Sequence, residues 1–365
     1  MTTRTQTADL LKGIAVLLMI QVHIIELFAS ETIYNSSAGK ILLFLGGPPV
    51  APLFMVVFGY FIAASRKTAG QLIVRGLKIL ALGMCLNIAL NLNLIISVYR
   101  GLFQIDLLPY YFGVDILQLA AISIVVIALF KKVFEKNILF VLLGISISIF
   151  LGSWLNNFTP QTKTLQYLLS YIYRCSDWSY FPLFPWLTYP LSGFALYKLK
   201  QQNGFDRINK SISRIFKNTE AQRFPIQITV GALFVIYLFF TLRYAISIAS
   251  DLPLYYHNDF IFALWTLVFL AFYGFMMNEL NNFSGESIPL KYIKWLGKNV
   301  TFIYVLQWLM IGNTATAIYK TVNSPLQLGM YYFGVLIIAS VMCSLLLLMK
   351  DRSFQKTVKA EIPRC

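Results

Sequence analysis

Apolar residues occur along this chain in long runs, separated by short polar or basic stretches. A helix needs roughly 20 mostly apolar residues to cross the hydrocarbon core of a bilayer. On that basis, membrane-spanning helices are predicted at 10–29, 48–64, 78–98, 112–130, 137–153, 181–198, 224–246, 259–278, 299–318 and 326–349. The pattern predicts an all-α, polytopic integral membrane protein with about ten transmembrane helices.

Prolines mark two places where these helices are expected to be irregular. Three of them stand just before Phe54 and remove backbone donors where the second span starts, so we expect 42–51 to be irregular. Three more, at 182, 185 and 190, predict a kinked sixth span. Broken helices of this kind are tolerated in a bilayer where they pack against protein or line a cavity.

The composition agrees with the pattern and excludes a soluble domain. Hydrophobic residues make up 58% of the 365 residues and charged residues 12%, and the mean hydropathy is +0.68. A soluble fold could not hide that much apolar surface. We therefore treat 1–365 as one transmembrane domain whose first partner is the lipid bilayer. The four cysteines have no metal-ligand spacing, so neither a metal site nor a disulfide framework is expected.

The formal net charge of +15 comes from 30 lysines and arginines against 15 acidic residues. The basic residues lie in short runs between apolar segments, so we expect no nucleic-acid partner. Most of them fall on one side if the N-terminus is inside, which predicts cytoplasmic termini in the cell membrane, plasma or inner. The basic loop 199–223 is amphipathic and is expected to lie on the cytoplasmic leaflet, with binding to a cytosolic protein as the alternative.

The first predicted span carries four ionisable residues, Asp9, Lys12, His23 and Glu26. At 100° per residue, the eleven steps from Lys12 to His23 return to nearly the same face, and Asp9 and Glu26 lie three residues beyond each. Ionisable groups at membrane depth are costly and by default mark a pathway or reaction site. His23 and Glu26 are therefore predicted to be catalytic, with histidine as proton carrier and the carboxylate steadying it. The alternative is a buried histidine that only bonds a neighbouring helix.

Two further polar pairs lie near the predicted outer side. Asp115 and Gln118 share a helical face at the start of the fourth span, and His257 and Asp259 belong to the outer loop DLPLYYHND. All four are predicted to contact the substrate, although a lone loop histidine is more often simply solvated. The outer stretch 154–180 is rich in aromatic residues, which fits a lid over an acceptor or an inert interfacial belt equally well.

The run D-x-x-K-G-I-A-V-L-L-M-x-x-x-H, from Asp9 to His23, resembles the first-helix signature of the transmembrane acyltransferase superfamily. That superfamily includes acyltransferase type 3 proteins and heparan-alpha-glucosaminide N-acetyltransferase-like proteins. Type 3 members have an arginine where this chain has Lys12, and many relatives have a histidine where it has Gln307. Four later stretches resemble the glucosaminide branch in order and spacing: APLFMVVFGYFIAAS, VDILQLAAISIVV, FPWLTYPLSGFALYKL and LGKNVTFIYVLQ.

The resemblance implies transfer of an acetyl group from cytoplasmic acetyl-CoA to a hydroxyl or amine of a glycan or small-molecule acceptor on the outer side. His23 would be the general base or the nucleophile that carries the acetyl group. The anionic donor would be held by five basic residues: Lys12, Arg66, Lys67, Arg75 and Lys298. No metal is implied, and a homo-oligomer is compatible with the sequence.

Two other function classes compete with this interpretation. Ionisable residues on one helix and proline-broken helices also suit a transporter or flippase of a small or lipid-linked substrate. The halves of the chain show no matching pair of broken helices, which favours the enzyme. The third class is a noncatalytic membrane subunit that uses its amphipathic loop for assembly.

Overall fold

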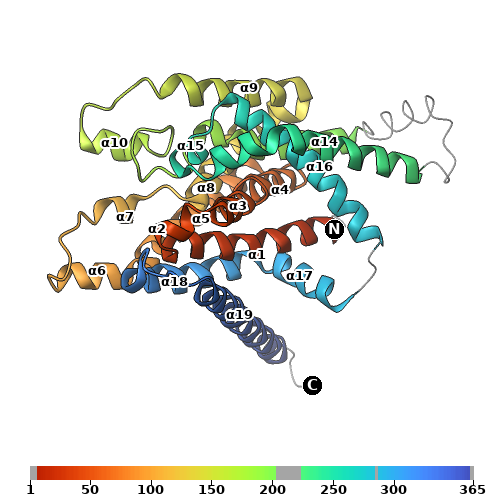
Figure 1. Ribbon diagram of the computed structural model, residues 1–365. Helices are drawn as coiled ribbons and strands as arrows, with labels where there is room; N and C mark the ends of the chain where they lie inside the picture. Colours follow the sequence, from red (N-terminus) through yellow and green to blue (C-terminus); the bar gives the residue numbers. More distant parts are fainter. Residues whose placement is uncertain (1–5, 203–222, 284–286, 362–365) are drawn as a thin grey trace.

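The computed structural model describes residues 6–202, 223–283 and 287–361, and these form helices joined by short turns and two isolated β-bridges (Figure 1). In chain order they are α1 (Gln6–Phe28), α2 (Glu31–Tyr34), α3 (Ser37–Gly46), α4 (Ala51–Ala63), α5 (Ala69–Leu90), α6 (Leu92–Tyr99), α7 (Leu108–Phe112), α8 (Ile116–Lys136), α9 (Ile138–Leu155), α10 (Lys163–Leu169), α11 (Leu183–Trp186), α12 (Thr188–Gln201), α14 (Arg223–Ala249), α15 (Leu252–Tyr256), α16 (Phe260–Phe283), α17 (Ile288–Lys298), α18 (Val300–Ile318) and α19 (Pro325–Glu361). Of the predicted basic loop 199–223, residues 203–222 lie outside the described part of the chain.

Within these described ranges, nine helical stretches are long and apolar enough to cross a membrane, with α3 and α4 together forming one of them. The prediction of an all-α, polytopic membrane protein is confirmed. Large apolar side chains stay exposed along α5, α9, α14 and α19, for example Phe239 at 81% and Leu326 at 74%. In a bilayer this surface faces lipid, which is as apolar as these side chains.

The sixth predicted span, 181–198, is present as two helices, α11 and α12. The backbone is non-helical at Phe184 (φ −105°, ψ 126°), and α12 begins at Thr188. The segment nevertheless runs from one end of the bundle to the other: Phe181 N–H donates to the Val114 carbonyl, and Lys198 Nζ donates to the Glu135 carbonyl at the far end of α8. The prolines therefore break this span, as predicted.

The start of the second predicted span differs from the expectation. Residues 42–46 are helical and belong to α3, and the irregular part is confined to the turn at 47–50. Ser36 caps α3 by accepting a hydrogen bond from Gly39 N–H (3.0 Å) and so allows a helix to start before the proline run. Pro52 then falls in the first turn of α4, where its missing donor costs little.

Connections that the charge pattern assigns to the same side contact each other. On the predicted outer side, Ala29 pairs with Val322 and Val114 pairs with Ser179 in the isolated bridges. On the predicted inner side, Lys131 Nζ donates to the carbonyl oxygen of Lys67 (2.9 Å). Figure 1 shows the short helices α2, α7, α10 and α15 gathered at the left and α17 at the right.

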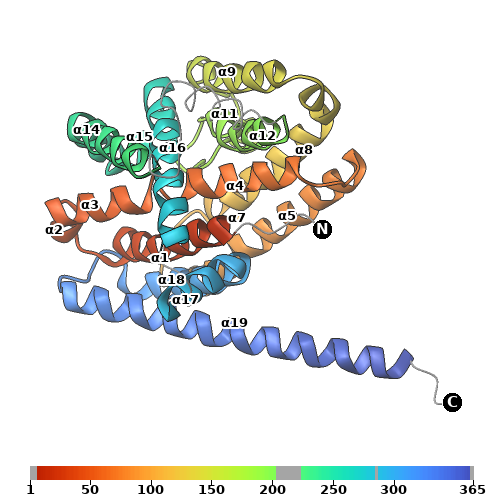
Figure 2. The same cartoon turned by 90° about the vertical axis from the view of Figure 1, so that its right-hand side faces the viewer.

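Helix α1 lies at the centre of the fold and contacts α3, α4, α16, α17, α18 and α19. Figure 2 shows α17 and α18 alongside α1, with the long α19 outside them. The crossing of α1 and α17 is close because it is made through two glycines. A Cβ on Gly13 would collide with the Ile293 carbonyl, and one on Gly297 with the Asp9 carbonyl. Small residues allow backbones to approach in this way in membrane helix pairs.

Candidate functional site

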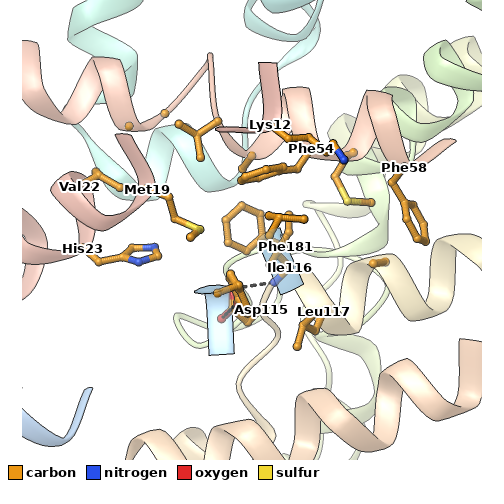
Figure 3. Close-up of a pocket in the computed structure, with 18 of the residues that line it drawn as sticks. Lys12, Met19, Val22, His23, Phe54, Phe58, Asp115, Ile116, Leu117 and Phe181 are labelled. Atoms are coloured by element: carbon orange, nitrogen blue, oxygen red, sulfur yellow. Dashed lines mark hydrogen bonds between the residues drawn. The ribbon is translucent and has the colours of Figure 1, made fainter. Parts of the chain in front are cut away.

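A cavity of about 530 Å³ lies beside α1 and is lined by residues of α3, α4, α5, α8, α14, α15 and α18. Its walls are mostly apolar, with Met19, Phe54, Phe58 and Phe181 among them (Figure 3). The ionisable residues that line it are Lys12, His23, Glu26, Arg75 and Asp115. A cavity with apolar walls and a few convergent polar groups is the usual form of a small-molecule site.

Three of those residues come from α1, which confirms that Lys12, His23 and Glu26 share one face of that helix. From its rise per residue, α1 separates Lys12 from His23 by about 16 Å along the helix axis. Lys12 Nζ lies 3.0 Å from Oδ1 of Asp9, which is buried at 2% exposure. The basic group is thus held at one end of the cavity and the histidine lies towards the other.

His23 is held by α18. Its Nδ1 lies 3.1 Å from Gln307 Oε1, and the centroid of its ring lies 4.0 Å from a Trp308 ring centroid. Glu26 instead accepts a long hydrogen bond from the Tyr256 hydroxyl (3.5 Å). The expected support of His23 by Glu26 is therefore not a direct hydrogen bond: the two side chains line the same cavity, and the ring is oriented by Gln307.

Asp115 is the residue before α8, and its carboxylate caps that helix. Oδ1 accepts from Ile116 N–H (2.6 Å), and Oδ2 accepts from the Tyr304 hydroxyl (2.9 Å). The predicted substrate residue Gln118 does not line the cavity. It is fully buried, and its Oε1 accepts from Asp115 N–H (3.3 Å), which completes a capping box. Asp115 therefore lines the cavity, whereas Gln118 supports Asp115 through the capping box.

The second predicted substrate pair, His257 and Asp259, also lies outside the cavity lining. His257 Nδ1 is 2.9 Å from the Pro253 carbonyl, and Nε2 is 2.6 Å from the Ser179 carbonyl. Burial lowers the pKa of His257 below its ordinary value, partly offset by its backbone carbonyl contacts. Asp259 accepts from Phe262 N–H (2.8 Å) at the start of α16. Both residues order the outer segments next to the cavity residues Phe181 and Tyr256.

Of the five basic residues predicted to hold the donor, the structure brings Lys12 and Arg75 to the cavity. Arg66, Lys67 and Lys298 lie outside its lining. Arg66 and Lys67 belong to the turn between α4 and α5, where carbonyls bind Lys131, and Lys298 is exposed at the end of α17. They lie near the predicted inner side of the bundle without contacting the cavity.

The structure adds polar and aromatic contacts that the sequence reasoning did not assign to the site: Tyr256, Tyr304, Gln307 and Trp308. Tyr304 and Gln307 are three residues apart and therefore share a face of α18, a spacing that the sequence contains. Tyr304 and Gln307 bind Asp115 and His23, which lie far away along the chain. Only the packing of α18 against α1 and the start of α8 shows these pairings.

The arrangement has the parts needed for group transfer. One end of the cavity offers two cations, suited to anionic groups such as phosphates. Towards the other end lie an imidazole, two carboxylates and two tyrosine hydroxyls, suited to binding a hydroxylated or amine-bearing molecule and moving a proton. The cavity wall between these groups is mostly apolar.

The comparisons with known proteins identify one family. The family model described as "Heparan-alpha-glucosaminide N-acetyltransferase, catalytic" matches residues 4–242. This range includes Lys12, His23, Glu26, Arg75 and Asp115, whereas Tyr256, Tyr304 and Gln307 lie beyond it. No curated protein and no solved structure gives a significant match.

Proposed function

Because this chain belongs to the heparan-alpha-glucosaminide N-acetyltransferase catalytic family, we propose that it is a membrane-bound, acetyl-CoA-dependent acetyltransferase. It moves the acetyl group from cytoplasmic acetyl-CoA to a hydroxyl or amine of a glycan-type acceptor on the outer side of the cell membrane. The observation that carries the proposal is the distribution of charge in one cavity, with Lys12 and Arg75 at one end and His23, Glu26 and Asp115 towards the other.

The donor half of the proposal depends on the cationic end. Acetyl-CoA carries several phosphate charges, and Lys12 and Arg75 supply ammonium and guanidinium donors for them. Arg66, Lys67 and Lys298 add positive potential on the same side of the bundle, which favours approach of an anion without requiring contact. The apolar residues along the cavity, such as Phe54 and Phe58, suit the uncharged arm of the donor.

The chemical half depends on His23. Gln307 occupies Nδ1, so Nε2 is available to the cavity. As general base, Nε2 takes the proton from the acceptor hydroxyl or amine while that atom attacks the thioester carbonyl, and the proton then passes to the departing thiolate of CoA. As nucleophile, Nε2 attacks the thioester carbonyl and CoA leaves as its thiolate. The acceptor hydroxyl or amine then attacks the acetyl carbonyl, which frees the neutral imidazole, and the proton that the acceptor loses passes to the thiolate. Glu26 and Asp115 line the same cavity and, as carboxylates, favour the imidazolium that forms by the first route.

The test uses purified full-length protein with acetyl-CoA labelled in the acetyl group. The proposal predicts that CoA raises the unfolding temperature of the protein. It also predicts that the labelled acetyl group passes to acceptors extracted from the outer side of the cell membrane. A transporter would show no labelled acceptor, and a noncatalytic subunit would show neither effect. Absence of both CoA stabilisation and label transfer would rule the proposal out.

A further inference from the structure

We propose that Gln307 is a positioning residue that holds the neutral imidazole of His23 with its proton on Nδ1 and leaves Nε2 unprotonated towards the cavity. This inference concerns the ring itself, and its catalytic meaning rests on the proposed function. The geometry behind it is the 3.1 Å contact between Nδ1 and the amide oxygen of Gln307. An amide oxygen only accepts, so the ring nitrogen that faces it must donate.

The burial of Gln307 makes this hydrogen bond important for the fold. The residue is fully buried in α18, between Leu306 and Trp308, in a helix that crosses the apolar core. Its amide Nε2 has no hydrogen-bond partner in the part of the chain that the structure describes. A buried amide without full compensation destabilises a fold. The contact with His23 is the interaction that accounts for a glutamine at this position.

A second contact from the same helix turn restrains the ring plane. Trp308 lies against His23 with ring centroids 4.0 Å apart and an interplanar angle of 31°. Gln307 fixes which nitrogen is protonated, and Trp308 fixes which way the ring faces. One helix turn of α18 therefore sets both the tautomer and the direction of Nε2.

The hydrogen-bond acceptor at Nδ1 is the neutral amide of Gln307, although a carboxylate lies on the same helix as His23. Glu26 is three residues from His23, yet its hydrogen-bond partner is the Tyr256 hydroxyl. A carboxylate at Nδ1 would also favour the charged imidazolium, whereas an amide orients the neutral ring. Neutral Nε2 is the form that both a general base and a nucleophile require.

The protonation state of the ring can be measured without any assay of acetyl transfer. The chain has 2 histidines, so full-length protein labelled with ¹⁵N-histidine gives two sets of ring signals, and His23→Ala assigns them. At pH 8, where an imidazole with a pKa of about 6.5 is neutral, the nitrogen shifts distinguish the two tautomers. The expected result for wild type is a protonated Nδ1 and a bare Nε2 at His23.

Two substitutions of similar shape separate the proposed role from packing. Gln307→Met removes the acceptor, so a mixture of tautomers is expected at His23, whereas Gln307→Glu keeps an oxygen and should keep the wild-type tautomer. Gln118→Met is the matched control, because Gln118 is likewise fully buried, with an Nε2 that has no described hydrogen-bond partner. It should leave the His23 signals unchanged. The signals of His257 report in every variant whether the outer segments remain ordered.

Kinetics then connect the tautomer to catalysis. Gln307→Met should lower kcat by about 10- to 100-fold, the range found when an orienting partner of a functional histidine is lost, with little change in KM for acetyl-CoA. Gln307→Glu should recover part of kcat. A wild-type His23 protonated on Nε2, or an unaltered tautomer in a folded Gln307→Met, would overturn the inference. An inactive wild type with the expected tautomer shift would refute the proposed function and leave the positioning role standing.

Discussion

At the scale of single residues, His23 sits between two roles, since it lines the cavity and also bonds a neighbouring helix. We expect His23→Ala to lower acetyl transfer by roughly 10² to 10⁴, the usual contribution of positioned acid–base catalysis. Glu26→Gln should do less harm because it keeps a hydrogen-bonding group for Tyr256. Turnover is measured at saturating acetyl-CoA on protein that still gains thermal stability from CoA.

Near-normal turnover in folded His23→Ala would remove it from the chemistry and turn attention to His257, whose ring nitrogens are both engaged by carbonyls. Joint loss of stability and CoA affinity would instead identify His23 as a packing residue. Wild-type CoA affinity with lost turnover is the pattern expected for a catalytic group.

Lys12 is expected to contribute to donor binding and to the fold at once. Its ammonium pairs with buried Asp9 at 3.0 Å, and it also lines the cavity. Lys12→Ala should weaken CoA binding by about tenfold or more, since a charged hydrogen bond contributes roughly 1.5 to 3 kcal/mol. It should also lower the unfolding temperature, because breaking a buried pair is costly. Lys12→Arg should retain both properties.

The measurement is a CoA titration of the unfolding temperature, with each variant compared with its own ligand-free value. Equal CoA affinity for wild type and Lys12→Ala would assign the lysine to the ion pair with Asp9 alone.

The sequence predicted the cavity residues Lys12, His23, Glu26, Arg75 and Asp115, but not the side-chain contacts between helices that hold them. Lys12, His23 and Glu26 follow from the 100° step of α1, and their shared cavity was expected. The contact of His23 with Gln307 joins residues 284 positions apart. No local spacing contains that pairing, whereas Glu26, three residues from His23, was the partner that the spacing suggested. Gln118 misled for a related reason, because a capping glutamine and a substrate-binding glutamine occupy the same helical spacing.

At the scale of elements, hydrophobic run length located the spans, and proline chemistry located the break between α11 and α12. The start of α3 was missed because its cap, Ser36, precedes the apolar run and resembles an ordinary loop residue. Two close helix crossings could not be predicted from the sequence. Gly13 and Gly297 join α1 to α17, and Gly59 and Gly193 join α4 to α12, but sequence does not say which glycines face a neighbour.

These crossings predict a difference between two glycines in helix interiors. Gly13→Ala would place a methyl group against the Ile293 carbonyl, whereas no atom of the described structure lies within 4 Å of a Cβ on Gly274 in α16. We expect Gly13→Ala to destabilise the fold by about 1 to 3 kcal/mol through overpacking. Gly274→Ala should be neutral or stabilising by up to about 1 kcal/mol. Thermal unfolding in one detergent measures both, and equal unfolding temperatures would show that the α1–α17 crossing relaxes at no cost.

At the scale of the whole molecule, packing shows which connections lie at the same end of the bundle, and charge predicts which end is cytoplasmic. Contacts such as Ala29 with Val322 group the connecting segments into two ends of the bundle, while the basic residues assign one end to the cytoplasm. We predict that a reporter fused after Lys200 scores as cytoplasmic and one inserted within Asn156 to Lys163 scores as external. The reverse pattern would invert the orientation and place Lys12 and Arg75 away from cytoplasmic acetyl-CoA.

The central position of α1 also determines when its contacts can form during synthesis of the chain. This helix leaves the ribosome before α17, α18 and α19, which pack against it. At about 5 to 20 residues per second, the 284 residues between His23 and Gln307 take on the order of tens of seconds to synthesise. Until α18 has been synthesised, the hydrogen bond between His23 and Gln307 cannot form. A nascent chain released before α18 emerges lacks the Gln307 and Trp308 contacts of His23, so its site is incomplete.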